Sequence, residues 1–472
     1  MSTILVAILS VLAAIMILVF VHELGHFLAA RFFGMRVDKF SVGFPPRIVG
    51  KKIGETEYVV GATPLGGYVK IAGMVDESMD TDFAESEPQP WEFRSKPVWQ
   101  RIIVITAGVV FNFILAAVIL AGLRFSNGDV FVPAENIQGI HVREGSVFHD
   151  LGLRTGDQIV AVNGNPLERF EDIFTQAIAP NGFVLNIDRD GEHIDIREPD
   201  GFLGRVTEEL RNSDDPNALG LSYITSVLGG VLPNGPAARA GLERGDRIVA
   251  IDGRSIRYFA EMRELIMASE GRSLTVNFVR PDSMDGAAGV EVVSTGDGLT
   301  EYQTTLTPEQ IQTAGGEFFG IGVHDADAEI IEREFGIVRR DLNLGEAAVA
   351  GVRETWRYGS LVVTSLYRVI SGRDSVRQTM GGPIEIGRQT GRALQQGLGE
   401  FWRIVAFLSI TLGIVNILPV PALDGGHLVF LLYEGITRRE PSLRVRVAMQ
   451  NIGMFVLLAF MAFMVINDIL RL

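Results

Sequence analysis

The sequence contains no cysteine among its 472 residues. This absence excludes thiolate zinc ligands, a nucleophilic cysteine and disulfide bonds, so a metal site has to be built from His, Asp and Glu. Histidine is scarce as well, with seven residues in the chain. The formal net charge of -15 argues against nucleic acid as a partner, because a chain with this charge is repelled by a phosphate backbone.

Long apolar runs, by contrast, are abundant. Hydrophobic residues make up 47% of the chain, and a mean hydropathy of +0.24 is typical of membrane proteins with sizeable soluble parts. We predict a polytopic α-helical membrane protein with four transmembrane helices, in residues 1–34, 101–125, 401–435 and, after a basic loop, 436–472. The first apolar run lacks a basic start and a clear cleavage site, so we expect an uncleaved span and not a signal peptide.

An HExxH motif, from His22 to His26, lies inside the first predicted span. On a helix His22 and His26 lie one turn apart on the same face, so both imidazoles can reach one zinc ion. Glu23 lies beside them and can take a proton from the attacking water. Two imidazoles and a carboxylate are costly in hydrocarbon without partners or a function, so simple core packing is a poor explanation. The motif predicts a metal-assisted hydrolase with one Zn2+ per chain.

The third predicted span carries further candidate ligands, in the segment 416–427. Two prolines break the helix there, and a break at membrane depth is tolerated only against protein or a wet cavity. Judged from the residues alone, either Asp424 or His427 can be the third ligand, since they lie three positions apart. Asn112, in the second span, is also a polar group at membrane depth. We consider two roles for Asn112: a hydrogen bond between helices, or an active-site role at the substrate or the oxyanion.

Residues 35–100 are predicted to form a cytoplasmic loop with a membrane-associated β-hairpin. Residues 57–60 and 68–71 have strand character, and a turn rich in glycine and proline lies between them. We predict that this segment offers a sheet edge to which a substrate strand is added. The candidate edge residues are Gly66, Gly67, Tyr68 and Val69, although an ordinary hairpin turn explains the two glycines as well.

An internal repeat occupies the middle of the chain. The stretch from Leu151 to Gly164 returns from Ala240 to Gly253, with GLxxGDxIVA in both copies. The pattern resembles PDZ domains, so we predict inserted PDZ-like α+β domains at 126–224 and 225–328, followed at 329–400 by a linker with amphipathic helices. PDZ-like domains bind extended peptides, and the candidate peptide-binding loops contain Gly220 and Gly320. A tandem that acts only as a spacer or plug is the alternative.

The distribution of basic residues predicts the orientation in the membrane. The loop before the last span carries Arg438, Arg439, Arg444 and Arg446, and the loop after the first span is basic too. The positive-inside rule places both loops in the cytoplasm, and the N-terminus, the repeats and the C-terminus outside. The HExxH motif follows an apolar run of about 20 residues, so we expect the active site nearer the cytoplasmic side. Asp468, just past the last span, is explained by snorkelling to the interface.

Together, HExxH in the first span, the tandem PDZ-like insert and NxxPxPxLDGG in the third span resemble the site-2 protease family of intramembrane zinc metalloproteases, over essentially the whole chain. The resemblance implies zinc held by His22, His26 and Asp424, with Glu23 as the general base and Asn416 near the substrate or the developing oxyanion. It also implies a substrate that spans the bacterial inner membrane once. Such a substrate is typically an anti-sigma factor already trimmed by an upstream site-1 protease during envelope stress, and remnant signal peptides are a further class.

Two other functional classes fit the sequence less well. A soluble-type zincin on a membrane anchor would carry HExxH on an amphipathic helix of a polar domain, whereas this motif lies in apolar sequence. A non-enzymatic PDZ scaffold would not need the HExxH and LDGG pair. We therefore expect a zinc metalloendopeptidase.

Overall fold

The computed structural model describes residues 3–74, 87–170, 172–173, 181–212, 219–282, 284, 290–296, 298–313 and 316–470. Parts of the predicted loop at 35–100 and of both repeats therefore lie outside the described residues. The chain divides into two compact units. The first unit comprises Met1–Gly128, Asp341–Leu366 and Met380–Leu472, and the second comprises Asp129–Arg340 and Tyr367–Thr379.

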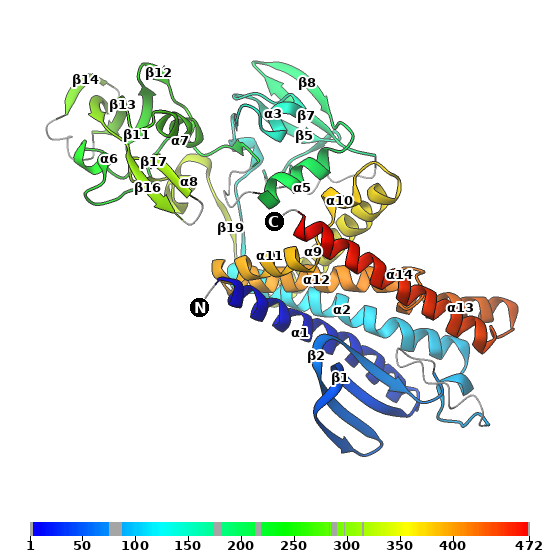
Figure 1. The fold of residues 1–472 in the computed structure, drawn as a ribbon. Helices are drawn as coiled ribbons and strands as arrows, with labels where there is room; N and C mark the ends of the chain where they lie inside the picture. The colour runs from blue at the N-terminus through cyan, green and yellow to red at the C-terminus, as the bar shows by residue number, and fades with distance from the viewer. Residues whose placement is uncertain are drawn as a thin grey trace. The chain divides into compact units, whose positions relative to one another are not determined.

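Within the described residues, four helices of the first unit are long and apolar enough to cross a membrane. They are α1 (Thr3–Phe32), α2 (Val98–Asn127), α12 (Leu398–Ile417) and α14 (Leu443–Ile469) (Figure 1). This agrees with the predicted spans. The predicted break in the third span is also present, because α12 ends at Ile417 and a separate helix, α13 (Asp424–Thr437), begins after the two prolines.

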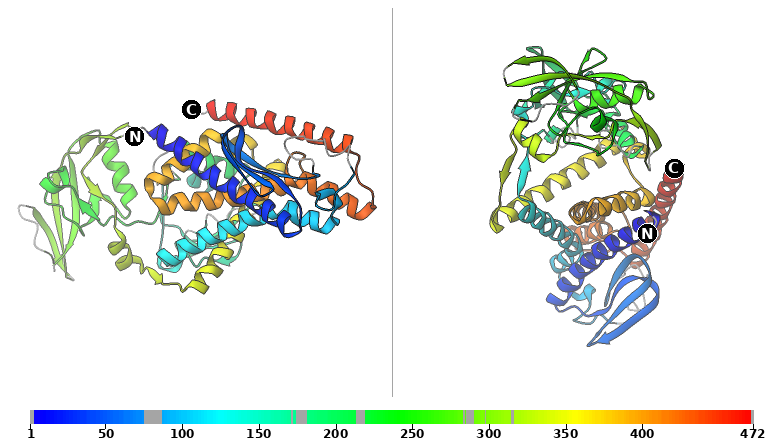
Figure 2. Two further views of the ribbon diagram at one scale, coloured as in Figure 1. Left: turned by 90° about the horizontal axis from the view of Figure 1, so that it is seen from below. Right: turned by 90° about the vertical axis from the view of Figure 1, so that its left-hand side faces the viewer.

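Helices α1, α2 and α12 lie side by side (Figure 2). The crossing of α1 and α2 is close because glycines occupy it. A Cβ atom at Gly25 of α1 would lie 2.5 Å from the carbonyl oxygen of Ala107 on α2. On its other side α2 packs against α12 through an apolar core that includes Ala116, Leu120 and Ile410. Helix α2 is thus fixed between the two helices that flank it.

A small antiparallel sheet packs beside α1. It consists of β1 (Val37–Ile53) and β2 (Thr56–Ile71). Both predicted strand segments are extended and belong to one long strand, β2. They run in opposite directions along residues 39–42 of β1, so the chain does change direction between them, but they do not pair with each other as in a hairpin. The hairpin turn that joins β1 to β2 lies at residues 54–55.

The two strands bend, so their halves pair separately. Residues 37–42 of β1 pair with 67–71 on one side and with 57–60 on the other. The described pairs of Gly67–Ile71 are all with β1, which makes this segment an edge of the sheet. The glycines of β2 also permit close strand contact, since a Cβ at Gly61 would lie 2.5 Å from the carbonyl oxygen of Gly43.

Helices make up most of the region that was predicted to be a linker. It contains α8 (Ala328–Phe335), β19 (Val338–Arg340), α9 (Leu344–Ile370), α10 (Val376–Thr379) and α11 (Pro383–Gln396). Its first part belongs to the second unit, because β19 pairs with β3 (Asp129–Phe131). Phe335 also lies in the core of the first repeat.

Each repeat forms a β-rich module with its own core. The first contains β4 (His141–Val142), α3 (Val147–Leu151), β5 (Gln158–Val162), β6 (Asn165–Pro166), β7 (Val184–Arg189), β8 (Glu192–Arg197), α5 (Phe202–Asn212) and β9 (Leu221–Ser222). Its main sheet has the order β6-β5-β7-β8.

The second module contains β10 (Gly230–Val231), α6 (Pro236–Arg239), β11 (Arg247–Ile251), β12 (Arg254–Ser255), α7 (Phe259–Ala268), β13 (Leu274–Pro281), β14 (Glu291–Gly296), β15 (Leu299–Leu306), β16 (Glu309–Thr313), β17 (Gly316–Gly320) and β18 (Val323–His324). Its main sheet has the order β12-β11-β13-β15-β14.

The aspartate of the repeated GLxxGD pattern has a structural role in both modules. Nε of Arg189 lies 2.7 Å from Oδ1 of Asp157, and Nε of Arg280 lies 2.7 Å from Oδ1 of Asp246. The two carboxylates are 1% and 0% exposed. A buried carboxylate of this kind requires a paired cation, so the repeat reflects a shared fold. The PDZ-like identity of the modules stays a prediction.

Candidate active site

Four ionisable side chains from the two sequence motifs meet inside the first unit. His22, Glu23 and His26 lie on α1, and Asp424 begins α13. Nε2 of His22 and Nε2 of His26 are 3.3 Å apart, and they lie 3.2 and 3.4 Å from Oδ2 of Asp424. Among the described residues, these three side chains are the one group of His, Asp and Glu that is placed to hold a metal ion.

The geometry of these three ligand atoms fits zinc. Tetrahedral ligands at about 2.0–2.1 Å from zinc are about 3.3–3.4 Å from one another, and the three separations in this structure are 3.3, 3.2 and 3.4 Å. Oδ2 of Asp424 is buried and has no hydrogen-bond partner, an unfavourable arrangement that a bound cation would relieve. Three protein ligands also leave the fourth position open, as catalytic zinc sites do.

Helix α2 orients the two imidazoles. Nδ1 of His26 lies 2.8 Å from the carbonyl oxygen of Val104, so Nδ1–H donates to it and Nε2 is left to bind metal. The Asn112 amide lies 3.1 Å from Nδ1 of His22. Gly108, between them, makes room, because a Cβ there would lie 2.3 Å from Nε2 of His26. The sequence alone did not identify Val104 or Gly108 as neighbours of the two imidazoles. The sequence signal that was present is the spacing of Gly108 and Asn112, which are four positions apart and therefore lie on one face of a helix.

Asn416, at the end of α12, also lies at the cluster. Its Nδ2 atom is 3.3 Å from Nε2 of His22. This nitrogen is one of the candidate ligand atoms, so Asn416 borders the candidate metal site. Its role at the substrate or oxyanion stays a prediction.

The broken helix positions Asp424. After α12 the chain turns sharply, with Ala422 in the left-handed region at φ 73°. The two glycines after Asp424 fit against this turn, since a Cβ at Gly425 would lie 2.0 Å from the carbonyl oxygen of Leu418. At Gly426 a Cβ would lie 2.7 Å from the carbonyl oxygen of Val420. The LDGG motif therefore allows a tight reversal that brings the Asp424 carboxylate to α1.

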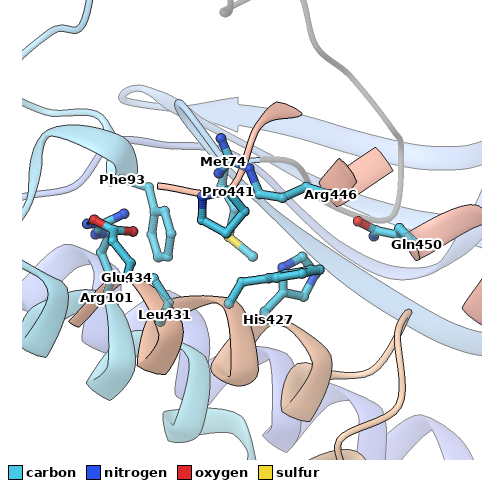
Figure 3. Close-up of a pocket in the computed structure, with 10 residues that line it drawn as sticks. Met74, Phe93, Arg101, His427, Leu431, Glu434, Pro441, Arg446 and Gln450 are labelled. Carbon is cyan, nitrogen blue, oxygen red and sulfur yellow. Dashed lines mark hydrogen bonds and ion pairs between the residues drawn. The ribbon is translucent and has the colours of Figure 1, made fainter. Parts of the chain in front are cut away.

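His427, the alternative ligand, lies one turn further along α13 and outside the cluster. Its side chain lines a different pocket, together with Met74, Arg446 and Gln450 (Figure 3). Arg101 donates a hydrogen bond to Glu434 at the same pocket. The geometry therefore favours Asp424 over His427.

The sheet edge formed by Gly67–Ile71 lies close to Glu23. A Cβ at Gly67 would lie 2.7 Å from Cγ1 of Val19 and 3.3 Å from Cγ of Glu23. Glu23 itself is 8% exposed. Gly66 lies further out, where a Cβ would lie 2.4 Å from the ring of Phe44. Tyr68 and Val69, the other candidate edge residues, follow in the same segment of β2.

The two candidate peptide-binding loops differ. Gly220 is left-handed at φ 67° and lines a pocket with His141, Arg143 and Leu221. Gly320, in contrast, is the last residue of strand β17 and pairs with Glu309. The first position therefore has loop geometry, whereas the second is extended.

Comparisons with known proteins cover almost the whole chain. The family model described as Peptidase family M50 matches residues 10–460. The chain is 31% identical to the regulator of sigma-E protease RseP of Escherichia coli, over 98% of each chain. It is 30% identical to a regulator of sigma E protease of Haemophilus influenzae, over 98% of each chain. It is also 31% identical to a candidate zinc metalloprotease of Vibrio cholerae, over 100% of each chain. The resemblance to site-2 proteases is thereby confirmed, and the chain belongs to peptidase family M50 and is a zinc metalloprotease.

Proposed function

We propose that this zinc metalloprotease cuts the transmembrane segment of single-span membrane proteins, with His22, His26 and Asp424 as the zinc ligands. The observation that carries the proposal is the near-tetrahedral spacing of the three ligand atoms. Two of these ligands belong to α1, whose apolar length suits a membrane span. A metal site built into such a helix serves a substrate that is itself in the bilayer.

Bound zinc would act as a Lewis acid that polarises the scissile carbonyl and lowers the pKa of water. Glu23, beside the ligands, is the general base that takes the proton of the attacking water and passes it to the leaving amine. Asn416 is placed to donate a hydrogen bond to the developing oxyanion. The sheet edge at Gly67–Ile71 supports the substrate backbone.

The substrate needs that support because a helical peptide bond is shielded by its own hydrogen bonds. Unwinding in a low-water site leaves N–H and C=O groups unpaired, at a cost of a few kcal/mol each. A substrate strand added to Gly67–Ile71 regains hydrogen bonds, and the glycine contact with Glu23 puts this strand next to the base.

The proposed biological substrate is a pre-trimmed anti-sigma factor in the bacterial inner membrane. Support comes from relatives named as regulators of sigma-E. In this scheme a site-1 protease first removes the bulk of the substrate outside the membrane. The two modules, also outside by the charge rule, exclude untrimmed substrates. Remnant signal peptides would be small enough to enter as well.

The test is Glu23→Gln, since the amide keeps the shape of the side chain and removes the base. We expect zinc content to stay at the wild-type level and cleavage of a model single-span substrate in detergent to fall by about 100-fold or more. Turnover near the wild-type rate would sink the assignment of Glu23.

A further inference from the structure

We propose that α2 holds the two imidazoles through the ring nitrogens that face away from Asp424, and that Asn112 is a positioning residue that keeps His22 in the tautomer that binds zinc. This inference rests on the proposed function, in which His22, His26 and Asp424 bind zinc. In this proposal Asn112 acts on the zinc ligand His22 and not on the substrate.

Three positions on one face of α2, spaced four residues apart, contact the two imidazoles. The carbonyl of Val104 accepts from His26, Gly108 leaves space for both rings, and the Asn112 amide lies 3.1 Å from Nδ1 of His22. Positions spaced in this way lie in one stripe along a helix. Each imidazole therefore has its outer nitrogen on α2 and its inner nitrogen toward Asp424.

The required tautomer follows from the donor inventory of imidazole. A neutral ring carries one proton, and the nitrogen that binds metal is the unprotonated one. For His22 the inner nitrogen is Nε2, so the proton must be on Nδ1 and needs an acceptor. Oδ1 of Asn112 is buried and has no hydrogen-bond partner. A half-turn of this amide brings Oδ1 to Nδ1–H and leaves the shape of the side chain unchanged.

A hydrogen bond between α2 and α12 does not explain this side chain. At Asn112 the hydrogen bond between α2 and α12 is made by the backbone, because Oγ of Ser409 donates to the Asn112 carbonyl at 2.8 Å. Both residues are 0% exposed. The Asn112 amide instead points to α1. Ser409 therefore offers a matched control that weakens the same helix contact and leaves His22 untouched.

The experiment compares zinc affinity in the full-length protein, by competition with a fluorescent chelator in detergent. Asn112→Ala removes the acceptor, and loss of such an outer partner lowers metal affinity by about 10–100-fold. Asn112→Asp keeps an acceptor and should stay close to the wild-type affinity. Ser409→Ala should also bind zinc like the wild type. The absorption bands of bound Co2+ provide a second readout, which should shift in Asn112→Ala but not in Ser409→Ala.

Equal zinc affinity in Asn112→Ala and the wild type would overturn the inference. So would equal losses in Asn112→Ala and Ser409→Ala, because they would indicate helix packing. If Asn112→Asp does not fold, the alanine pair and the Co2+ bands still decide. Failure of the proposed function looks different, since His22→Ala would then bind zinc as the wild type does.

Discussion

Asp468, in the last turn of α14, accepts a hydrogen bond at 3.0 Å from the backbone N–H of Ile384, in the first turn of α11. The same carboxylate accepts from the N–H groups of Gly382 and Glu385, at 3.0 and 3.1 Å. Asp468 is 7% exposed, so the prediction that it snorkels to the interface is wrong. It caps α11 from another helix, where the unpaired N–H groups and the helix dipole favour an anion.

Asp468→Ala should therefore destabilise the protein. Removal of a capping side chain costs about 0.5–2 kcal/mol. The control is Glu400→Ala, whose half-exposed pair with Arg403 contributes about 0–1 kcal/mol. Thermal unfolding in detergent should show a lower midpoint for Asp468→Ala than for Glu400→Ala. Equal midpoints would mean that the cap contributes little.

Gly108→Ala should impair zinc binding without unfolding α2. Its Cβ would lie 2.3 Å from Nε2 of His26 and 2.8 Å from Cε1 of His22, so the ligands must move. The control is Gly122→Ala on the same helix, where a Cβ would have no neighbour within 4 Å. Alanine at such a helix position is favoured by about 0.5–1 kcal/mol. Zinc content after dialysis should fall only in Gly108→Ala, and an equal result for both variants would contradict the close approach.

The absence of cysteine makes the sheet edge testable by cross-linking. In the Glu23→Gln background, Lys70→Cys should form a disulfide with a model single-span peptide that carries one cysteine next to the cut site. Lys51→Cys, on the β1 segment at the opposite side of the sheet, is the control. Strand addition predicts cross-linking at Lys70 and much less at Lys51. Equal cross-linking yields at the two positions would contradict strand addition at Gly67–Ile71.

The substrate filter can be tested by removing the modules. Because β3 and β19 pair, residues 132–337 can be replaced by a short flexible linker with little displacement of the chain ends. Arg368 loses Glu198 in this variant but keeps its pair with Asp374. The shortened protein should bind zinc, cleave a short substrate at the wild-type rate and cleave an untrimmed one as well. A well-folded, zinc-loaded variant that cleaves neither would exclude the filter model.

Local signals in the sequence explain most of what was predicted correctly. The spans follow from uninterrupted apolar runs, and the end of α12 follows from two prolines that cannot continue a helix. Amphipathic helices were predicted at 329–400, and the long helix α9 (Leu344–Ile370) lies within that range. Each of these features depends on residues that are neighbours along the chain.

The errors and omissions arise where the decisive partner is distant in sequence. Gly61 and Gly67 flank a change of chain direction, as the composition predicted, but the sequence did not indicate that β1 passes close to both of them. The contact between Asn112 and His22 joins residues 90 positions apart. Asp468 reaches the start of α11, 84 positions from Ile384. A sequence pattern names the polar residue in such cases, but only the packing of the helices supplies its partner.

The most direct test of the central claim is the zinc stoichiometry of purified Asp424→Asn and His427→Ala. An amide is a poor zinc ligand compared with a carboxylate, and Asp424, not His427, lies beside the two imidazoles. We predict that the wild type and His427→Ala each retain one zinc ion per chain and that Asp424→Asn loses most of its zinc. Full zinc content in Asp424→Asn together with loss in His427→Ala would contradict the proposed metal site.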